Sequence, residues 1–174
     1  MQSHFKDLER ILGAVSGSKT RQFLKLLIGA PRVFLYGLGR SGLVARMFGM
    51  RLVHLGRDAT IVGDTTTPAI GSKDLLVVCS RTGVSPFLHH AVRLARRQGA
   101  RVAILSGQRA SPLAKDADFV LRLPIELARL ETPQPMGSLF EQALLLYLDA
   151  LVLTLMADLG KTPEDMERVH SNLP

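Results

Sequence analysis

Aromatic residues are scarce in this sequence, which has no tryptophan, two tyrosines and seven phenylalanines among its 174 residues. Proteins that bind nucleic acid by base stacking interleave aromatic and basic side chains, and this chain offers no such platform. Its net charge is +7, but the basic residues are scattered, with Arg96 and Arg97 the only adjacent pair. We therefore expect no nucleic-acid partner and attribute the charge to a general attraction for anionic metabolites.

Cysteine is almost absent as well. Cys79 is the only one, so no disulfide can form within the chain, and we expect a reducing, cytoplasmic location. Because Cys79 ends an apolar run, we expect a buried structural thiol.

Residues 1–10 lack the apolar core of a signal peptide. Apart from the neighbouring His89 and His90, the histidines show no metal-ligand spacing, and no acidic or cysteine cluster accompanies them, so we expect no metal.

Strand-like and helix-like segments alternate along the chain. Short apolar runs predict strands at 32–36, 59–62, 74–79, 101–105 and 119–123. Helical periodicity predicts two helices within 3–28 and others at 41–55, 84–98, 138–159 and 163–169, with room for a short helix in 106–118. Connections of crossover length predict an α/β fold, a three-layer αβα sandwich around a five-stranded parallel sheet.

The length predicts one domain spanning 1–174. Within it we expect N-terminal helices in 1–30, the core sheet and its helices in 31–124, and a C-terminal helix and tail in 125–174. Ligands of such sheets bind beyond the carboxyl ends of the strands. The loops that follow the first and third strands are therefore the places to look for a binding site.

The first of these loops joins a buried strand directly to a helix. The apolar run at 33–36 ends on Gly37 and Gly39, and the helix that follows begins near Ser41. Unpaired N–H groups and the positive end of the helix dipole bind anions at such a joint, and glycines let the backbone approach the bound group. We expect a phosphate here, with Ser41 at the cap position.

Two other interpretations of the same glycines stay open. Gly37, Gly39 and Gly42 satisfy the G-x-G-x-x-G pattern, and Asp64 follows about twenty residues later, as in a dinucleotide site. The glycines could equally serve a tight turn and close helix packing. A chain of this length leaves little room for a substrate domain beside a nucleotide domain, which favours phosphate binding.

The loop after the third strand carries three hydroxyl groups. Ser80, Thr82 and Ser85 surround Gly83, and a helix follows. Hydroxyls and amides at a helix start form a neutral cradle for phosphate, and Arg81 can add charge. Helix capping would account for one serine but not for three hydroxyls. A third polar turn, with threonines at 65–67, is equally compatible with a ligand site and with a plain turn.

The helix expected at 138–159 is apolar nearly all round, although Glu141, Asp149 and Asp158 lie within it. Its length would allow a membrane span, but these charges and the loop before it argue against one. A helix on the surface of a monomer would keep a polar face. We therefore expect no membrane association and predict that this helix is buried in a subunit interface of a homo-oligomer.

Several segments together resemble one family. They are GLGRSGLVARMFGMRLVHLG, GDTTTPAI, SRTGVS, QPMGSLFEQALLLYLDALV and MERVHSNL. Nearly the whole chain resembles the 6-phospho-3-hexuloisomerases, a branch of the sugar isomerase (SIS) domain proteins. The resemblance implies a flavodoxin-like five-stranded fold, a tetramer, and the interconversion of 3-hexulose 6-phosphate and fructose 6-phosphate during formaldehyde assimilation through the ribulose monophosphate route. It implies no cofactor and no metal. Arg81 stands where the family usually has a small residue.

The resemblance also implies roles for individual residues. Glu141 would be the base that moves a proton between carbons, and His170 would pass a proton between the two oxygens. The resemblance implies that Ser41, Ser80, Thr82 and Ser85 fix the phosphate. From the residues themselves we add Gly39 and Gly83, which let the backbone approach the anion, and Arg81, which can add charge.

Plainer interpretations of both catalytic candidates remain. Glu141 could close a capping box with Ser138, and His170 could be an unstructured tail residue. A sugar-phosphate-binding SIS module without chemistry is the rival function, and a dinucleotide-binding protein is a third.

Overall fold

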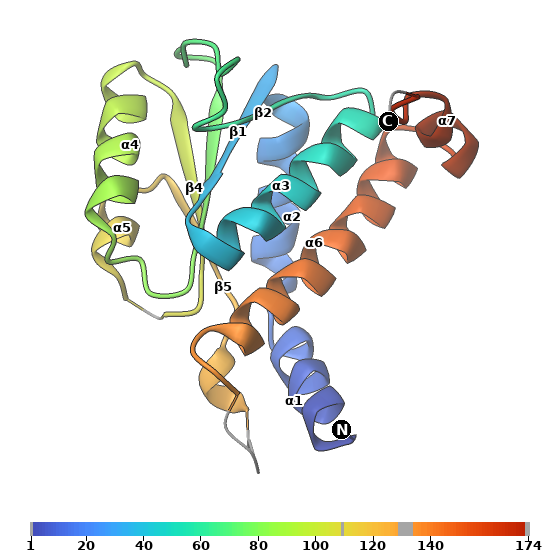
Figure 1. The fold of residues 1–174 in the computed structure, drawn as a ribbon. Coiled ribbons are helices and arrows are strands. Elements are labelled where there is room, and N and C mark those ends of the chain that lie inside the picture. The colour runs from blue at the N-terminus through green and yellow to red at the C-terminus, as the bar shows by residue number, and fades with distance from the viewer. Residues whose placement is uncertain (1, 109, 129–133, 173–174) are drawn as a thin grey trace.

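The computed structural model describes residues 2–108, 110–128 and 134–172 (Figure 1). Five parallel strands form one sheet in the order β2-β1-β3-β4-β5. The strands are β1 Arg32–Gly37, β2 Asp58–Ile61, β3 Leu75–Ser80, β4 Arg101–Ser106 and β5 Phe119–Arg122. This order is the flavodoxin-like one. The expected α/β fold with a five-stranded parallel sheet is confirmed.

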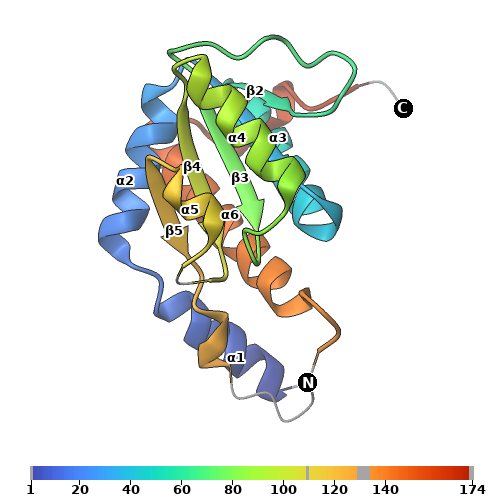
Figure 2. The same cartoon turned by 90° about the vertical axis from the view of Figure 1, so that its left-hand side faces the viewer.

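Helices cover both faces of the sheet (Figures 1 and 2). They are α1 Gln2–Gly13, α2 Gly17–Gly29, α3 Gly39–His54, α4 Pro86–Arg97, α5 Pro112–Lys115, α6 Ser138–Asp158 and α7 Pro163–Arg168, with a 3-10 turn η1 Ile125–Leu127. The α4 and α5 helices lie on one face, and α2, α3 and α6 lie on the other. Each predicted helix is present, so the αβα sandwich is confirmed.

The central strand β3 is buried along its whole length, as its uninterrupted apolar run predicts. Its side chains alternate between two hydrophobic clusters, one on each face of the sheet. Val77 and Cys79 belong to the cluster under α3 and α6, whereas Leu76 and Val78 belong to the cluster under α4. The sheet therefore has a separate core on each side.

The α6 helix packs one side against its own chain. Its buried residues, which include Phe140, Leu144 and Leu148, join the larger core cluster, whereas Leu146 and Leu153 are exposed. By length and composition α6 is able to cross a membrane, but 56% of its most apolar stretch is buried inside the fold. A core helix accounts for this apolar composition without a membrane.

One local prediction is wrong, and one open alternative is excluded. The α3 helix begins at Gly39 with Leu38 as its N-cap, so Ser41 is not the cap residue but lies buried within the first turn. The capping box of Ser138 and Glu141 does not form, because Gly137 is the N-cap of α6 and no side chain caps this helix. The Ser138 hydroxyl instead donates to the Pro135 carbonyl at 2.9 Å.

Candidate functional site

The two predicted phosphate loops lie side by side because β1 and β3 are neighbours in the sheet. Gly37, the last residue of β1, is in register with Cys79 of β3. A cleft of about 280 Å³ opens above this edge, and the start of α6 closes one side of it. It is lined by Leu38, Ser41, Cys79, Ser80, Arg81, Thr82, Ser85, Leu88, Gly137 and Glu141. The fold thus brings most of the predicted site residues together.

The joint between β1 and α3 requires glycine for steric reasons. A Cβ added to Gly42 would lie 2.4 Å from the Gly37 carbonyl oxygen. Gly39 has a φ of +55° with open space around it, which is a conformation that other residues adopt at a cost. Close packing therefore explains Gly37 and Gly42. Asp64, the residue that a dinucleotide site would use, accepts two hydrogen bonds from Arg46, at 2.6 and 3.1 Å.

The loop after β3 is held in a compact turn. The Gly83 amide donates to the Ser80 hydroxyl at 3.0 Å. Gly83 has a φ of +63°, and a Cβ there would lie 2.4 Å from Ser111 Oγ. Ser85 is the N-cap of α4, but its hydroxyl makes no capping hydrogen bond. Ser80 and Gly83 therefore shape the loop. Among the described residues the Ser85 hydroxyl has no partner, so it and the amides that follow Pro86 in the first turn of α4 can bind an anion.

Cys79 lines the same cleft, but its buried thiol is not expected to act as a nucleophile. It is 1% exposed, and burial raises the pKa of its thiol to about 12. The nucleophilic form of cysteine is the thiolate. The prediction of a buried structural thiol is confirmed.

Glu141 reaches the cleft from the first turn of α6, with its side chain 11% exposed. Arg40, in the first turn of α3, donates from Nε to Glu141 Oε2 and forms an ion pair with it. This pair joins the starts of two helices that are far apart in the sequence. Since the capping alternative does not form, the carboxylate is available at the cleft with one oxygen held by Arg40.

The Arg81 side chain also lies near Glu141. A Cβ added to Gly137 would lie 3.0 Å from Glu141 Oε1 and 3.2 Å from Arg81 Nε, so both side chains pass over this glycine. The Arg81 guanidinium makes no hydrogen bond or ion pair with any residue that the structure describes. One unpaired cation therefore stands beside the carboxylate.

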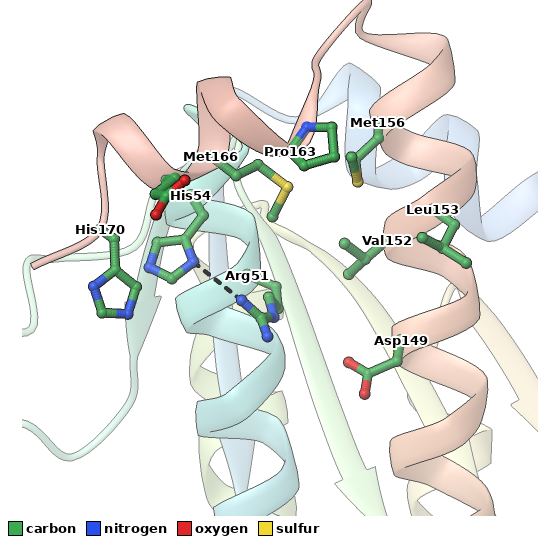
Figure 3. Close-up of a pocket in the computed structure, with 10 residues that line it drawn as sticks. Arg51, His54, Asp149, Val152, Leu153, Met156, Pro163, Met166 and His170 are labelled. Carbon is green, nitrogen blue, oxygen red and sulfur yellow. Dashed lines mark hydrogen bonds between the residues drawn. The ribbon is translucent and has the colours of Figure 1, made fainter.

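His170 does not lie in this cleft. It lines a second cavity of about 460 Å³ between the C-terminal ends of α3 and α6 and helix α7 (Figure 3). Its ring is 5.1 Å from that of His54, and Arg51 lies 3.5 Å from His54 Nδ1. Burial, His170 and Arg51 lower the pKa of His54. Arg40 and His54 stand at opposite ends of the 16-residue α3, so Glu141 and His170 of one chain are roughly 20 Å apart.

Sequence reasoning overlooked two residues at these sites. Arg40 belongs to the segment GLGRSG, and a charged residue inside a glycine-rich joint was the available signal. His54 gave no signal, because only the fold brings it to His170.

Thr67 takes a structural role, since its hydroxyl lies 2.8 Å from the Ile61 carbonyl and 2.6 Å from the Asp64 carbonyl. In the described parts of the chain, no group of three or more metal-ligating side chains occurs.

Comparison with known proteins defines the class. Residues 26–152 match the model of the SIS domain family. The chain is 37% identical over 172 residues to the 3-hexulose-6-phosphate isomerase of Bacillus subtilis, covering 96% of this chain and 93% of that protein. It is 38% identical to the enzyme of the same name from Methylomonas aminofaciens, covering 87% of this chain and 86% of that one. The chain therefore belongs to the SIS domain family.

A solved structure agrees with this assignment. A protein of Methanococcus jannaschii, whose crystal structure led to an inferred function as a 3-hexulose-6-phosphate isomerase, superimposes with a TM-score of 0.84 at 29% identity. The match covers 90% of this chain and 86% of that one. Within the family, this chain is thus similar over most of its length to 3-hexulose-6-phosphate isomerases.

Proposed function

We propose that the chain is a 3-hexulose-6-phosphate isomerase, which interconverts D-arabino-hex-3-ulose 6-phosphate and D-fructose 6-phosphate in the ribulose monophosphate pathway of formaldehyde assimilation. The observation that carries the proposal is the Glu141 carboxylate, which shares one cleft with two hydroxyl-bearing loops. Relatives of that name match at 37% and 38% identity over most of the chain. A sugar-phosphate-binding module without chemistry would have no need for a carboxylate at this place.

The phosphate would lie between the start of α3 and the start of α4. Ser41, Ser85 and the amides of these first helical turns offer neutral donors, and both helix dipoles favour an anion there. Thr82 adds a hydroxyl-bearing residue to the cleft on the same loop, while Gly39, Ser80 and Gly83 give the loops their shape. Binding energy from this remote group would orient the sugar carbons toward Glu141.

The reaction needs a single base at the carbons. Glu141 removes the proton from C2 of the 3-ketose, the C2–H electron pair forms a C2–C3 double bond, and the carbonyl pair moves to O3. A proton then passes from O2 to O3, the C2 carbonyl forms, and Glu141 returns its proton to C3. Atoms and electrons balance without an external oxidant, because the ketone only moves along the chain. The Arg40 bond to Oε2 leaves Oε1 to exchange this proton.

We further propose that His170 acts from a neighbouring subunit in a homo-oligomer, with a tetramer as the expected state. A general acid must come within hydrogen-bond reach of its proton, which His170 of the same chain does not. The α3 and α6 helices run side by side in the same direction (Figure 1). Their outward faces expose a row of apolar residues, namely Leu43, Met47, Met50, Leu146 and Leu153.

A two-fold axis through this apolar face and perpendicular to α3 and α6 would pair the helices of two copies in antiparallel fashion. Such pairing sets the His170 end of one chain against the Glu141 end of the other, so that each copy completes the site of its partner. It would also bury the apolar row. We expect the assembly to be cytoplasmic, since a metabolic enzyme with one free thiol suits a reducing compartment.

Direct assay tests the activity. The purified protein should convert 3-hexulose 6-phosphate to fructose 6-phosphate without added NAD, and Glu141→Gln should lower kcat by about 10²-fold or more while the protein stays folded. Asp158→Asn, at the far exposed end of the same helix, is the control and should retain full turnover. An inactive parent protein, or a Glu141→Gln variant with normal turnover, would refute the proposal.

Complementation tests the role of His170. Glu141→Gln and His170→Asn should each be poorly active alone. After the two proteins are mixed under conditions that exchange subunits, activity should return to about a quarter of the parent value, because half of the randomly formed pairs contain one intact site of two. Mixing without any recovery, although hybrids form, would show that His170 does not serve its neighbour.

A further inference from the structure

The guanidinium of Arg81 has an unusual position for a phosphate ligand. Arg81 follows β3 directly, and its side chain turns toward the start of α6. Its Nε and Cδ lie 3.2 and 3.3 Å from the point where a Cβ of Gly137 would stand, and Glu141 Oε1 lies 3.0 Å from the same point. The cation is therefore beside the base, while the free donors of the phosphate cradle are at the starts of α3 and α4.

Proton removal next to a ketone creates a charge that the site must stabilise. The C2–H pair becomes the new double bond, and the former carbonyl oxygen O3 becomes an enediolate anion. Fixed donors aimed at such an oxygen make a large contribution to catalysis. Arg40 is committed to Glu141 Oε2, whereas Arg81 has no partner among the residues described.

We propose that in this chain Arg81, which replaces the small residue usual in the family, is a catalytic residue that binds the reacting oxygens and carries the enediolate charge, rather than a ligand of the phosphate. Its planar fork of N–H groups is suited to bridging O2 and O3, which lie on neighbouring carbons. A guanidinium does not deprotonate in proteins, so Arg81 stabilises charge but moves no proton. The proton transfer between O2 and O3 is left to another group, and this division suits a histidine supplied by a neighbour.

This inference rests on the proposed isomerase function. It also gives the two arginines near Glu141, Arg40 and Arg81, different roles. Arg40 is a positioning residue, since it acts through its hydrogen bond to Glu141 Oε2. It holds Oε2, so that Oε1 stays on the side of the cleft where Arg81 lies. The base and the electrophile then face the same two carbons of the sugar from the α6 end of the cleft.

The test separates charge stabilisation from phosphate binding. Arg81→Met keeps much of the side-chain length and removes the charge, Arg81→Lys keeps the charge, and Arg93→Met on the exposed face of α4 is the control for lost net charge. Each variant is assayed for kcat, for KM, and for competitive inhibition by inorganic phosphate. The hydrogen isotope effect is measured with substrate deuterated at C2.

We expect Arg81→Met to lose about 10²- to 10³-fold in kcat, the range seen when a donor to a developing oxyanion is removed. Its inhibition constant for phosphate should stay within about threefold of the parent value, its isotope effect should rise because proton removal becomes slower, and Arg81→Lys should recover part of kcat. Arg93→Met should match the parent.

The opposite pattern would overturn the inference. A tenfold or greater rise in both KM and the phosphate inhibition constant, with kcat nearly unchanged, would make Arg81 a phosphate ligand. Parent-like kinetics of Arg81→Met would give it no role. In both cases the parent enzyme still turns over, so the proposed function stands; a parent without isomerase activity would instead refute the function itself.

Discussion

Gly137 offers a way to disturb the catalytic geometry without disturbing the fold. Its φ of −104° and ψ of 6° are accessible to alanine. The added Cβ would lie 3.0 Å from Glu141 Oε1, 3.2 Å from Arg81 Nε and 3.3 Å from Arg81 Cδ. All three atoms belong to long side chains that can shift by a few tenths of an ångström. The clash is therefore relieved when Glu141 and Arg81 move away from their present positions.

We expect Gly137→Ala to lower kcat by about tenfold, because displacements of this size at a reacting centre cost up to about 10²-fold per ångström. Stability should fall by no more than about 1 kcal/mol, the usual effect of placing alanine at a helix N-cap. Steady-state assays and urea unfolding measure the two quantities separately. Gly17→Ala is the control, since its Cβ would come no closer than 3.9 Å to another residue.

The reasoning fails if Gly137→Ala turns over at the parent rate, because Glu141 and Arg81 would then not need their present positions. It also fails if the variant loses several kcal/mol of stability. The glycine would in that case be required by the backbone, and a slower enzyme would say nothing about the two side chains.

Three further predictions concern the structure around the sites. Cys79 should not react with a disulfide reagent at pH 8 in the native protein but should react fully in urea, because burial raises its pKa to about 12; rapid labelling of the native protein would contradict this. Burial lowers the pKa of His54 in the folded state, so the unfolded chain binds the proton more readily. The free energy of unfolding, measured in urea, should therefore decrease as the pH falls below about 6.5, and this decrease should be smaller in His54→Gln; an equal decrease in both proteins would rule out His54 as its source. Gly83→Ala should be less stable than Gly56→Ala by about 1 to 3 kcal/mol, since both have positive φ but only at Gly83 would the Cβ strike Ser111, at 2.4 Å; equal melting temperatures would refute this.

Local patterns predicted much of the fold. The uninterrupted apolar run of β3 indicated a strand buried on both faces, and helical spacing indicated the two helices within 3–28. These features depend on neighbours in the sequence, so they can be read from it. Helix ends were less predictable. The start of α3 was placed at Ser41, whereas Leu38 caps the helix, and the close approach of Gly37 and Gly42 at this joint depends on the fold.

Some features of the candidate site could likewise be read from the sequence, and others depended on the fold. The sequence by itself determined which loops carry hydroxyls and glycines, and that these loops follow strands, since each is a continuous stretch of chain. Only the tertiary structure decided that Arg40 pairs with Glu141, that Arg81 stands beside them without a partner among the described residues, and that His170 lies with His54 at the other end of α3. The physical reason is that an ion pair or a ring contact depends on distance in space, and the packing of α3 against α6 sets that distance across 101 residues of sequence.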